Sequence, residues 1–218
     1  MEKRDILTEK PRPPEADPRA LLGAEFVIAA AALDQLPPPG PPEVAFAGRS
    51  NAGKSSAINA LANRNRLAFA SRTPGRTQQI VMFALPNGAI VADLPGYGYA
   101  AVPKAVKRVW QDVLATYVAT RPTLVGLVVV VDARHGVRPL DFTLLDDFLR
   151  SGREVIVLAT KSDKLARQAS AQASATIRRD LAERYPAHRD RITVIPFSAT
   201  ARTGLAEADA ILARWLGR

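Results

Sequence analysis

The 218-residue sequence has no cysteine, few aromatic residues and no long hydrophobic run. Without cysteine, disulfides, thiolate metal sites, iron–sulfur clusters and cysteine nucleophiles are excluded. The longest strongly apolar runs, at 26–33 and 124–131, are far shorter than the roughly 20 residues of a membrane-spanning helix. The first ten residues mix acids with bases and lack the apolar core of a secretory signal. We therefore expect a cytoplasmic protein with no membrane span.

Acidic residues are missing from one long stretch of an otherwise mildly basic chain of net charge +9. Residues 47–92 contain no acid, but they contain the cations Arg49, Lys54, Arg64, Arg66, Arg72 and Arg76. A basic surface of this size indicates an anionic partner, with nucleic acid as the leading candidate. The alternative is a set of solvated arginines that only keep the protein in solution.

Proline concentrates near the N-terminus and suggests how the chain is organised. Much of the proline falls within residues 11–42, where it disfavours a continuous helix and favours extended geometry. We expect residues 1–24 to form a mobile tail and residues 25–42 to form a packed lead-in. The apolar stretch 21–36 is compatible with either a strand or a short helix. The folded domain should then span residues 43–218.

From residue 43 onward, apolar strands alternate with amphipathic helices. We expect strands at 43–48, 79–85, 89–93, 124–132, 154–160 and 192–198, and helices at 54–62, 103–120, 139–151, 168–184 and 203–216. The Pro-Asn-Gly turn at 86–88 predicts a hairpin. This order predicts a three-layer α/β fold with a mostly parallel, six-stranded sheet and one antiparallel edge strand. Ligands of such sheets bind at the carboxyl ends of the strands.

The first of those strand ends carries a phosphate-binding pattern. Residues 48–55, GRSNAGKS, fit G-x-x-x-x-G-K-[ST] between a predicted strand and a predicted helix. The glycines let backbone N–H groups close around phosphate oxygens, and the helix N-terminus adds its dipole. Lys54 would reach the β- and γ-phosphates, and Ser55 would coordinate Mg²⁺. A chance match in this context is rare, so the sequence predicts a P-loop.

Three shorter sequence strings lie at the carboxyl ends of later predicted strands, in a fixed order along the chain. DLPG at 93–96 offers an acid that can hold Mg²⁺ through water and a glycine N–H for the γ-phosphate. TKSD at 160–163 offers a carboxylate that can accept from guanine N1 and N2, a donor pair that adenine lacks. Residues 198–199 offer a backbone N–H to guanine O6. Together with the P-loop, these strings predict a guanine-nucleotide site.

Five strings carry a resemblance to a known family: GRSNAGKSSAINAL, SRTPGRTQQI, DLPGYGYA, TKSDK and FSA. Together they resemble the EngB (YihA/YsxC) family of ribosome-biogenesis GTP-binding proteins, which are TRAFAC-class P-loop GTPases. The resemblance covers about residues 25–216 and implies an α/β/α P-loop G domain that binds GTP or GDP with Mg²⁺. It also implies a cytoplasmic GTPase switch that acts in large ribosomal subunit assembly and is needed for normal cell division and septation. The implied partner is the large ribosomal subunit or its precursor, and we expect a monomer.

The resemblance also assigns residues. From the residues alone, Thr73 and Thr77 are equal candidates for the switch I ligand, and the family pattern implies Thr77. The implied Mg²⁺ ligands are Ser55, Thr77 and Asp93, and the implied catalytic residues are Asn51, Lys54, Thr77 and Gly96. The implied nucleotide site consists of Gly48, Arg49, Ser50, Asn51, Ala52, Gly53, Lys54, Ser55, Gly75, Arg76, Thr77, Gln78, Gln79, Asp93, Leu94, Pro95, Gly96, Thr160, Lys161, Ser162, Asp163, Phe197, Ser198 and Ala199.

Two positions depart from the wider superfamily. Thr160 stands where many GTPases have asparagine, so it cannot give an amide to the base, although the EngB-like pattern tolerates threonine. Tyr97 follows DLPG where Ras-like proteins have a water-orienting glutamine. We therefore expect slow intrinsic hydrolysis, with the missing group supplied by the bound ribosome or by a monovalent cation. Asn51 is the candidate ligand for that cation, K⁺.

Two functions fit these observations. In the first, the protein is a GTPase switch whose nucleotide state controls docking to a ribosomal precursor. In the second, it is a slowly hydrolysing or non-hydrolysing, guanine-nucleotide-gated binding module in division or septation. Tyr97 is the residue that keeps the second function open.

Overall fold

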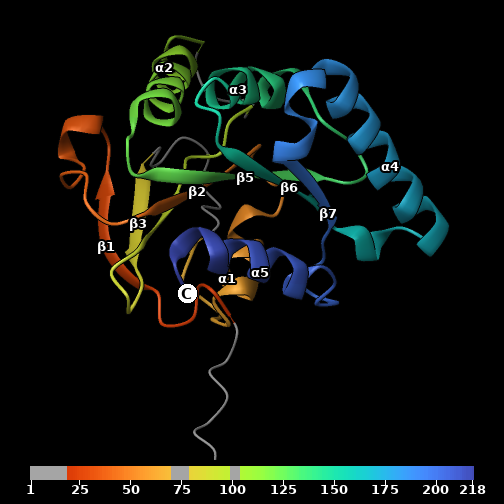
Figure 1. Ribbon diagram of the computed structural model, residues 1–218, viewed down its shortest axis with the longest axis horizontal. Helices are drawn as coiled ribbons and strands as arrows, with labels where there is room; N and C mark the ends of the chain where they lie inside the picture. Colours follow the sequence, from red (N-terminus) through yellow and green to blue (C-terminus); the bar gives the residue numbers. More distant parts are fainter. Residues whose placement is uncertain (1–18, 70–78, 99–103) are drawn as a thin grey trace, which may run out of the picture.

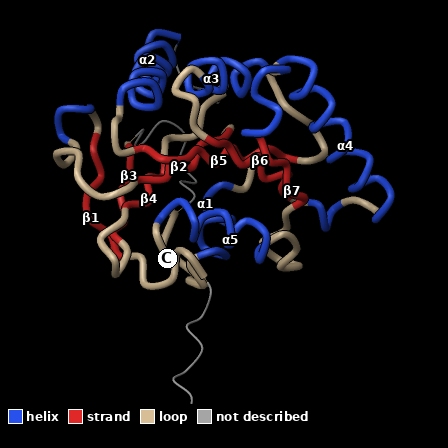
Figure 2. The backbone as a smooth tube through the Cα atoms, viewed as in Figure 1, coloured by secondary structure: helices blue, strands red, loops and turns tan. Residues whose placement is uncertain are grey.

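The computed structural model describes residues 19–69, 79–98 and 104–218. In this part of the chain a central sheet lies between two layers of helices (Figure 1; Figure 2 shows the same view coloured by secondary structure). The strands are β1 (Glu25–Ala30), β2 (Glu43–Gly48), β3 (Ile80–Ala84), β4 (Ile90–Asp93), β5 (Leu124–Asp132), β6 (Glu154–Thr160) and β7 (Ile192–Pro196). The α-helices are α1 (Lys54–Leu61), α2 (Lys104–Thr120), α3 (Pro139–Leu149), α4 (Arg167–Arg184) and α5 (Leu205–Leu216). Short 3-10 helices lie at Leu33–Gln35, Ser162–Lys164 and Pro186–Arg191.

The sheet has the strand order β1-β3-β4-β2-β5-β6-β7. Strands β4, β2, β5, β6 and β7 are mutually parallel, and β3 runs antiparallel to both of its neighbours. Helices α1 and α5 cover one face, and α2, α3 and α4 cover the other (Figure 1). The central strand β5 is buried almost throughout, as its β-branched run requires. The predicted three-layer α/β/α class is confirmed.

The sheet contains one strand more than the six predicted. Strand β1, from the lead-in, pairs antiparallel with β3, in a register that runs from Glu25 opposite Ala84 to Ala30 opposite Ile80. It forms because β3 would otherwise leave a row of unpaired N–H and C=O groups at the edge of the sheet. The edge strand is therefore β1, and the expected hairpin of β3 and β4 lies one position further in.

The packed chain also begins earlier than residue 25. Ala20, Leu21 and Ala24 are buried in the core on the side of α1 and α5. The backbone N–H of Ala20 donates to the buried carboxylate of Asp209 in α5 at 2.5 Å. Arg218 donates to the carbonyl of Ala20 at 2.9 Å. Residues 19–24 are thus part of the core and not of the expected tail, and residues 1–18 lie outside the described residues. None of the described helices is long and apolar enough to cross a membrane.

The contact between β5 and α5 leaves no room for a side chain at Gly126. A Cβ at this position would lie 2.3 Å from Cε3 of the buried Trp215 ring. We expect Gly126→Ala to lower the free energy of unfolding by about 1–3 kcal/mol, because the ring or the strand has to shift. Urea unfolding of the two proteins measures the difference. Gly40→Ala is the matched control, since nothing lies within 4 Å of its Cβ, and equal losses in both variants would contradict this packing.

Candidate functional site

The predicted P-loop joins β2 to α1 at the carboxyl end of the sheet. Gly48 lies so close to β5 that a Cβ would be 2.7 Å from the carbonyl oxygen of Val130. Gly53 precedes α1 with a φ of 102°, in the left-handed region that favours glycine. No described side chain caps the N-terminus of α1. Its first N–H groups and the positive end of its dipole are therefore available to an anion.

The lysine of the P-loop and the acid that ends β4 are in direct contact. Lys54 Nζ donates to Oδ1 of Asp93, and both side chains are largely buried. Ser55 follows Lys54 in the first turn of α1 and is half-buried. A cation, a carboxylate and a hydroxyl thus come from adjoining positions at one edge. This donor set fits a nucleotide phosphate with its Mg²⁺.

The DLPG string extends the sheet beyond β4 and lies against the P-loop. Leu94 N–H donates to the carbonyl of Phe46, and Ser50 N–H donates to the carbonyl of Tyr97 at 2.8 Å. A Cβ on Gly96 would lie 3.1 Å from Oγ of Ser50. The glycine that should meet the γ-phosphate is therefore within contact distance of the P-loop.

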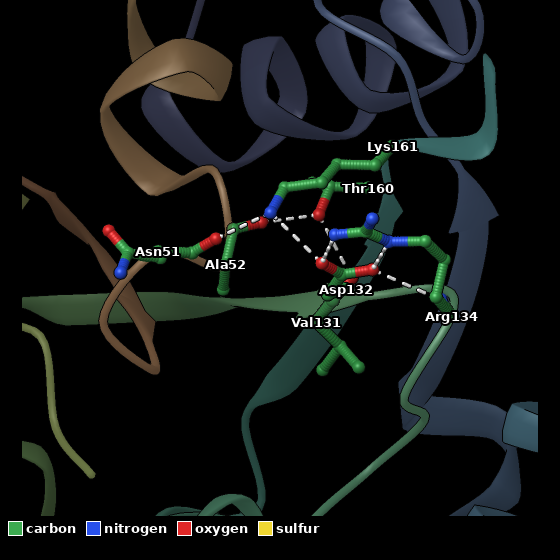
Figure 3. A network of polar contacts seen from close by, with 7 residues as sticks. All are labelled: Asn51, Ala52, Val131, Asp132, Arg134, Thr160 and Lys161. Carbon is green, nitrogen blue, oxygen red and sulfur yellow. Dashed lines mark hydrogen bonds and ion pairs between the residues drawn. The ribbon is translucent and has the colours of Figure 1, made fainter. Parts of the chain in front are cut away.

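The TKSD string reaches the P-loop from the end of β6 (Figure 3). Lys161 Nζ donates to the carbonyl of Asn51 at 2.7 Å. Thr160 Oγ1 contacts the carbonyl oxygens of Ala52 at 2.5 Å and Val131 at 3.0 Å. The threonine that replaces asparagine therefore uses its hydroxyl to hold the P-loop to β5 and β6.

A residue that the sequence analysis missed, Asp132, completes this network at the end of β5 (Figure 3). It accepts hydrogen bonds from Nε and Nη2 of Arg134 at 2.9 and 2.7 Å, and it pairs with Lys161 at 2.9 Å. Burial by itself would raise the pKa of Asp132, but the hydrogen bonds from Arg134 and Lys161 outweigh it and lower that pKa well below its usual range. The only sequence signal is an acid that closes a buried strand at the same edge as DLPG and TKSD.

A cavity of about 190 Å³ adjoins this network, between the P-loop and the start of α3. Its lining includes Arg49, Asp132, His135, Asp141 and Lys161. Neither Lys54 nor Asp163 lines it. The cavity therefore shares the P-loop residues 49–52 and Lys161 with the predicted nucleotide site, but it does not reach Lys54 or Asp163.

The residues predicted to recognise the base come from two different strands and meet after β6 and β7. Ser198 Oγ donates to Oδ1 of Asp163 at 2.7 Å, and this hydrogen bond lowers the pKa of the Asp163 carboxyl. Ser162 Oγ donates to the carbonyl of Phe197 at 3.0 Å, and Ala199 follows on the same loop. The side chain of Asp163 is 22% exposed and its carboxylate is ionised, as an acceptor for guanine N1 and N2 has to be.

The side chain of Tyr97 is hydrogen-bonded to α3. Its buried hydroxyl donates to Oδ1 of Asp141 at 2.6 Å, and Asp141 also accepts from the backbone N–H of Arg138 at 2.8 Å. Burial, followed by the charge of Asp141, raises the pKa of Tyr97 well above its usual value. The phenol therefore stays protonated, and its hydrogen is engaged by Asp141 of α3.

Four of the residues assigned from the resemblance, Gly75, Arg76, Thr77 and Gln78, lie outside the described residues. The role of Thr77 as a Mg²⁺ ligand therefore stays a prediction. Gln79 is described and directly precedes β3. The other assigned residues come together at the carboxyl edge of the sheet, and their roles toward a nucleotide stay predictions.

The fold and the strand-end strings define a P-loop GTP-binding domain, and comparison with known proteins narrows the class. Residues 43–161 match the family described as "50S ribosome-binding GTPase". The "Probable GTP-binding protein EngB" of Azoarcus sp. (strain BH72) is 49% identical over 193 residues, which cover 88% of this chain and 91% of that protein. Its Bordetella pertussis counterpart is 48% identical over 200 residues, covering 88% and 94%. The chain belongs to the EngB family of GTP-binding proteins, as the sequence motifs predicted.

Solved structures share the fold. A crystal structure of a probable GTP-binding protein EngB aligns with a TM-score of 0.61 at 22% identity, covering 80% of this chain and 98% of that one. A structure of Era with MgGDPNP and nucleotides 1506-1542 of 16S ribosomal RNA aligns with a TM-score of 0.60 at 22% identity, covering 82% and 57%. At this level of identity the likeness establishes the common fold alone.

The ionised Asp132 makes a pH-dependent contribution to stability. Its pKa is lower in the folded chain than in the unfolded chain, so the contribution is present above about pH 4 and is lost as the pH falls toward the folded pKa. We expect Asp132→Asn to lower the free energy of unfolding by about 2 kcal/mol at pH 7. The gap between variant and parent should stay constant from pH 7 to about pH 5 and shrink as the pH falls below about 4.

Urea unfolding at several pH values measures that gap. Asp112→Asn, which removes an exposed carboxylate on α2, is the matched control and should show little change at any pH. A gap for Asp132→Asn that stays constant or widens toward acid pH would show that the ion pairs of Figure 3 are not the cause.

Proposed function

We propose that this protein is a GTP-regulated factor of large ribosomal subunit assembly, needed for normal cell division and septation. The observation that carries the proposal is that the P-loop, DLPG, TKSD and FSA strings lie together at one edge of the sheet. There Lys54 donates a hydrogen bond to Asp93, and Ser198 donates one to Asp163. The description of the matching family as ribosome-binding supports the choice of partner. We place the protein in the cytoplasm as a monomer.

In the proposed site, residues at different strand ends bind different parts of the nucleotide. Lys54 and the first N–H groups of α1 hold the phosphates, and Gly96 gives its N–H to the γ-phosphate. Ser55, Thr77 and Asp93 hold Mg²⁺, which neutralises phosphate charge when it is bound. Asp163 reads guanine N1 and N2, and Lys161 keeps the P-loop carbonyl of Asn51 in place.

The state of Tyr97 decides between a switch and a passive binding module. Since its hydroxyl is engaged by Asp141, this chain has no water-orienting side chain at the position after DLPG. Asn51 is exposed, so its side-chain oxygen is accessible, and it remains our candidate K⁺ ligand. The same engagement of Tyr97 favours the second candidate, a guanine-nucleotide-gated division factor that hydrolyses GTP slowly or not at all.

Single-turnover hydrolysis of GTP tests the proposal. We expect slow turnover by the protein alone and faster turnover with large ribosomal subunits, because the subunit or K⁺ supplies the group that Tyr97 does not. Reactions in Na⁺ and in K⁺, with small subunits as the control, separate the two sources. Equal rates with large subunits, with small subunits and without either would favour the passive binding module.

Base selection depends on Asp163. We expect Asp163→Asn to weaken GDP binding about 100-fold, because guanine N1 and N2 lose a charged acceptor. The same variant should gain affinity for xanthosine diphosphate, whose C2 oxygen needs a donor. Competition binding with GDP, ADP and xanthosine diphosphate measures both effects. Asp190→Asn, at an exposed position in the 3-10 helix Pro186–Arg191, is the control, and ADP binding as tight as GDP by the parent would refute the assignment.

A further inference from the structure

The loop that follows α1 is held in a defined shape by one side chain. Asn59 Oδ1 accepts from the backbone N–H groups of Leu67 at 2.9 Å and Ala68 at 2.8 Å, and Asn59 Nδ2 donates to the carbonyl of Ala68 at 2.9 Å. The side chains of Leu67 and Ala68 are buried in the core beside α1. The backbone N–H of Arg64 donates to the carbonyl of Asn59 at 2.9 Å. The loop is thus anchored at both ends.

This anchored loop presents an aromatic ring and two cations to solvent. Phe69 is 73% exposed, more than any other large hydrophobic residue in the described part of the chain. Arg64 and Arg66 are exposed, and neither pairs with a carboxylate of a described residue. Residues 47–92 contain no acid at all. We call Arg64, Arg66 and Phe69 the loop platform.

The chemical groups of the loop platform indicate which kind of partner it binds. An exposed phenyl ring lacks the stabilisation that a buried ring would give, so a partner that covers it gains free energy. The flat face of the ring stacks well on a nucleobase. Guanidinium groups bind phosphate through paired, charge-assisted hydrogen bonds. A docking site for an apolar protein surface would need more exposed apolar residues, but Leu67 and Ala68 before the ring are buried, and the exposed residues of the loop before them, Asn63 to Arg66, are polar or cationic. The combination fits a nucleic acid with an accessible base.

We propose that the loop platform binds unpaired RNA, with Phe69 stacked on one base and Arg64 and Arg66 on neighbouring phosphates. This inference rests on the proposed function and names the feature of the large subunit that the protein recognises. A base inside a duplex is stacked and paired, so the platform discriminates in favour of single-stranded loops and ends.

The loop platform is separate from the nucleotide site, although α1 joins the P-loop to the loop that carries the platform. Helix α1 begins at Lys54 of the P-loop and ends at Leu61, just before the loop. Eight residues of helix span about 12 Å. Substitutions at Phe69 should therefore leave GDP affinity unchanged, and GDP binding serves as the check that each variant is folded.

Binding of a fluorescent single-stranded RNA of about ten nucleotides measures the contact, and the same RNA annealed into a duplex is the reference. We expect Phe69→Ala to weaken single-strand binding about tenfold, with Phe69→Leu nearly as weak and Phe69→Trp at least as strong as the parent. Phe26→Ala is the matched control, because Phe26 on β1 is 63% exposed but has no such arginines near it in sequence. Arg64→Glu with Arg66→Glu should weaken binding and flatten its salt dependence.

Co-sedimentation with large ribosomal subunits separates failure of this inference from failure of the proposed function. If the parent does not bind large subunits, the proposed function fails. If the parent binds them and Phe69→Ala binds equally well, the loop platform is not the contact and the inference is overturned. Recovery of binding in Phe69→Leu, or equal binding of the single strand and the duplex, would also overturn it, because base stacking then plays no part.

Discussion

The ammonium group of Lys161 holds the site together from the end of β6. It donates to the backbone carbonyl of Asn51 and pairs with Asp132, while the neighbouring Thr160 hydroxyl meets the carbonyl of Ala52 (Figure 3). These contacts connect the P-loop to two parallel strands whose own positions are set by the buried sheet. The shape of the phosphate-binding loop therefore depends on polar partners that satisfy one another, of which Asp132 and Thr160 are buried and Lys161 is partly exposed.

The opposite flank of the P-loop is held by a second set of contacts that bears on catalysis. The segment after β4 pairs with the P-loop through Ser50 and the backbone of Tyr97, and the Tyr97 side chain is bound by Asp141 of α3. This arrangement fixes the start of the segment that would sense the γ-phosphate. The weak intrinsic hydrolysis that we propose rests on the hydrogen bond from the Tyr97 hydroxyl to Asp141.

The sequence predicted the fold where local chemistry is strong. The P-loop pattern, the hairpin turn at 86–88 and the β-branched run of β5 each indicate one structure, and all were found. The stretch 21–36 was left open between a strand and a short helix, because residues 25–30 do not alternate, and the pairing with β3 that makes them the strand β1 is a long-range contact. Asp132 was missed because its partner Lys161 is distant in sequence. The burial of residues 19–24 depends on α5, at the far end of the chain.

Regulation by GTP requires that the nucleotide site and the ribosomal contact be energetically coupled. The direct measurement is the affinity of the parent protein for large ribosomal subunits in the presence of GDP and of a non-hydrolysable GTP analogue with Mg²⁺, at one salt concentration. Tighter binding with the analogue, by about tenfold or more, is the result expected of a GTP-regulated assembly factor. Equal affinity with both nucleotides would contradict a switch.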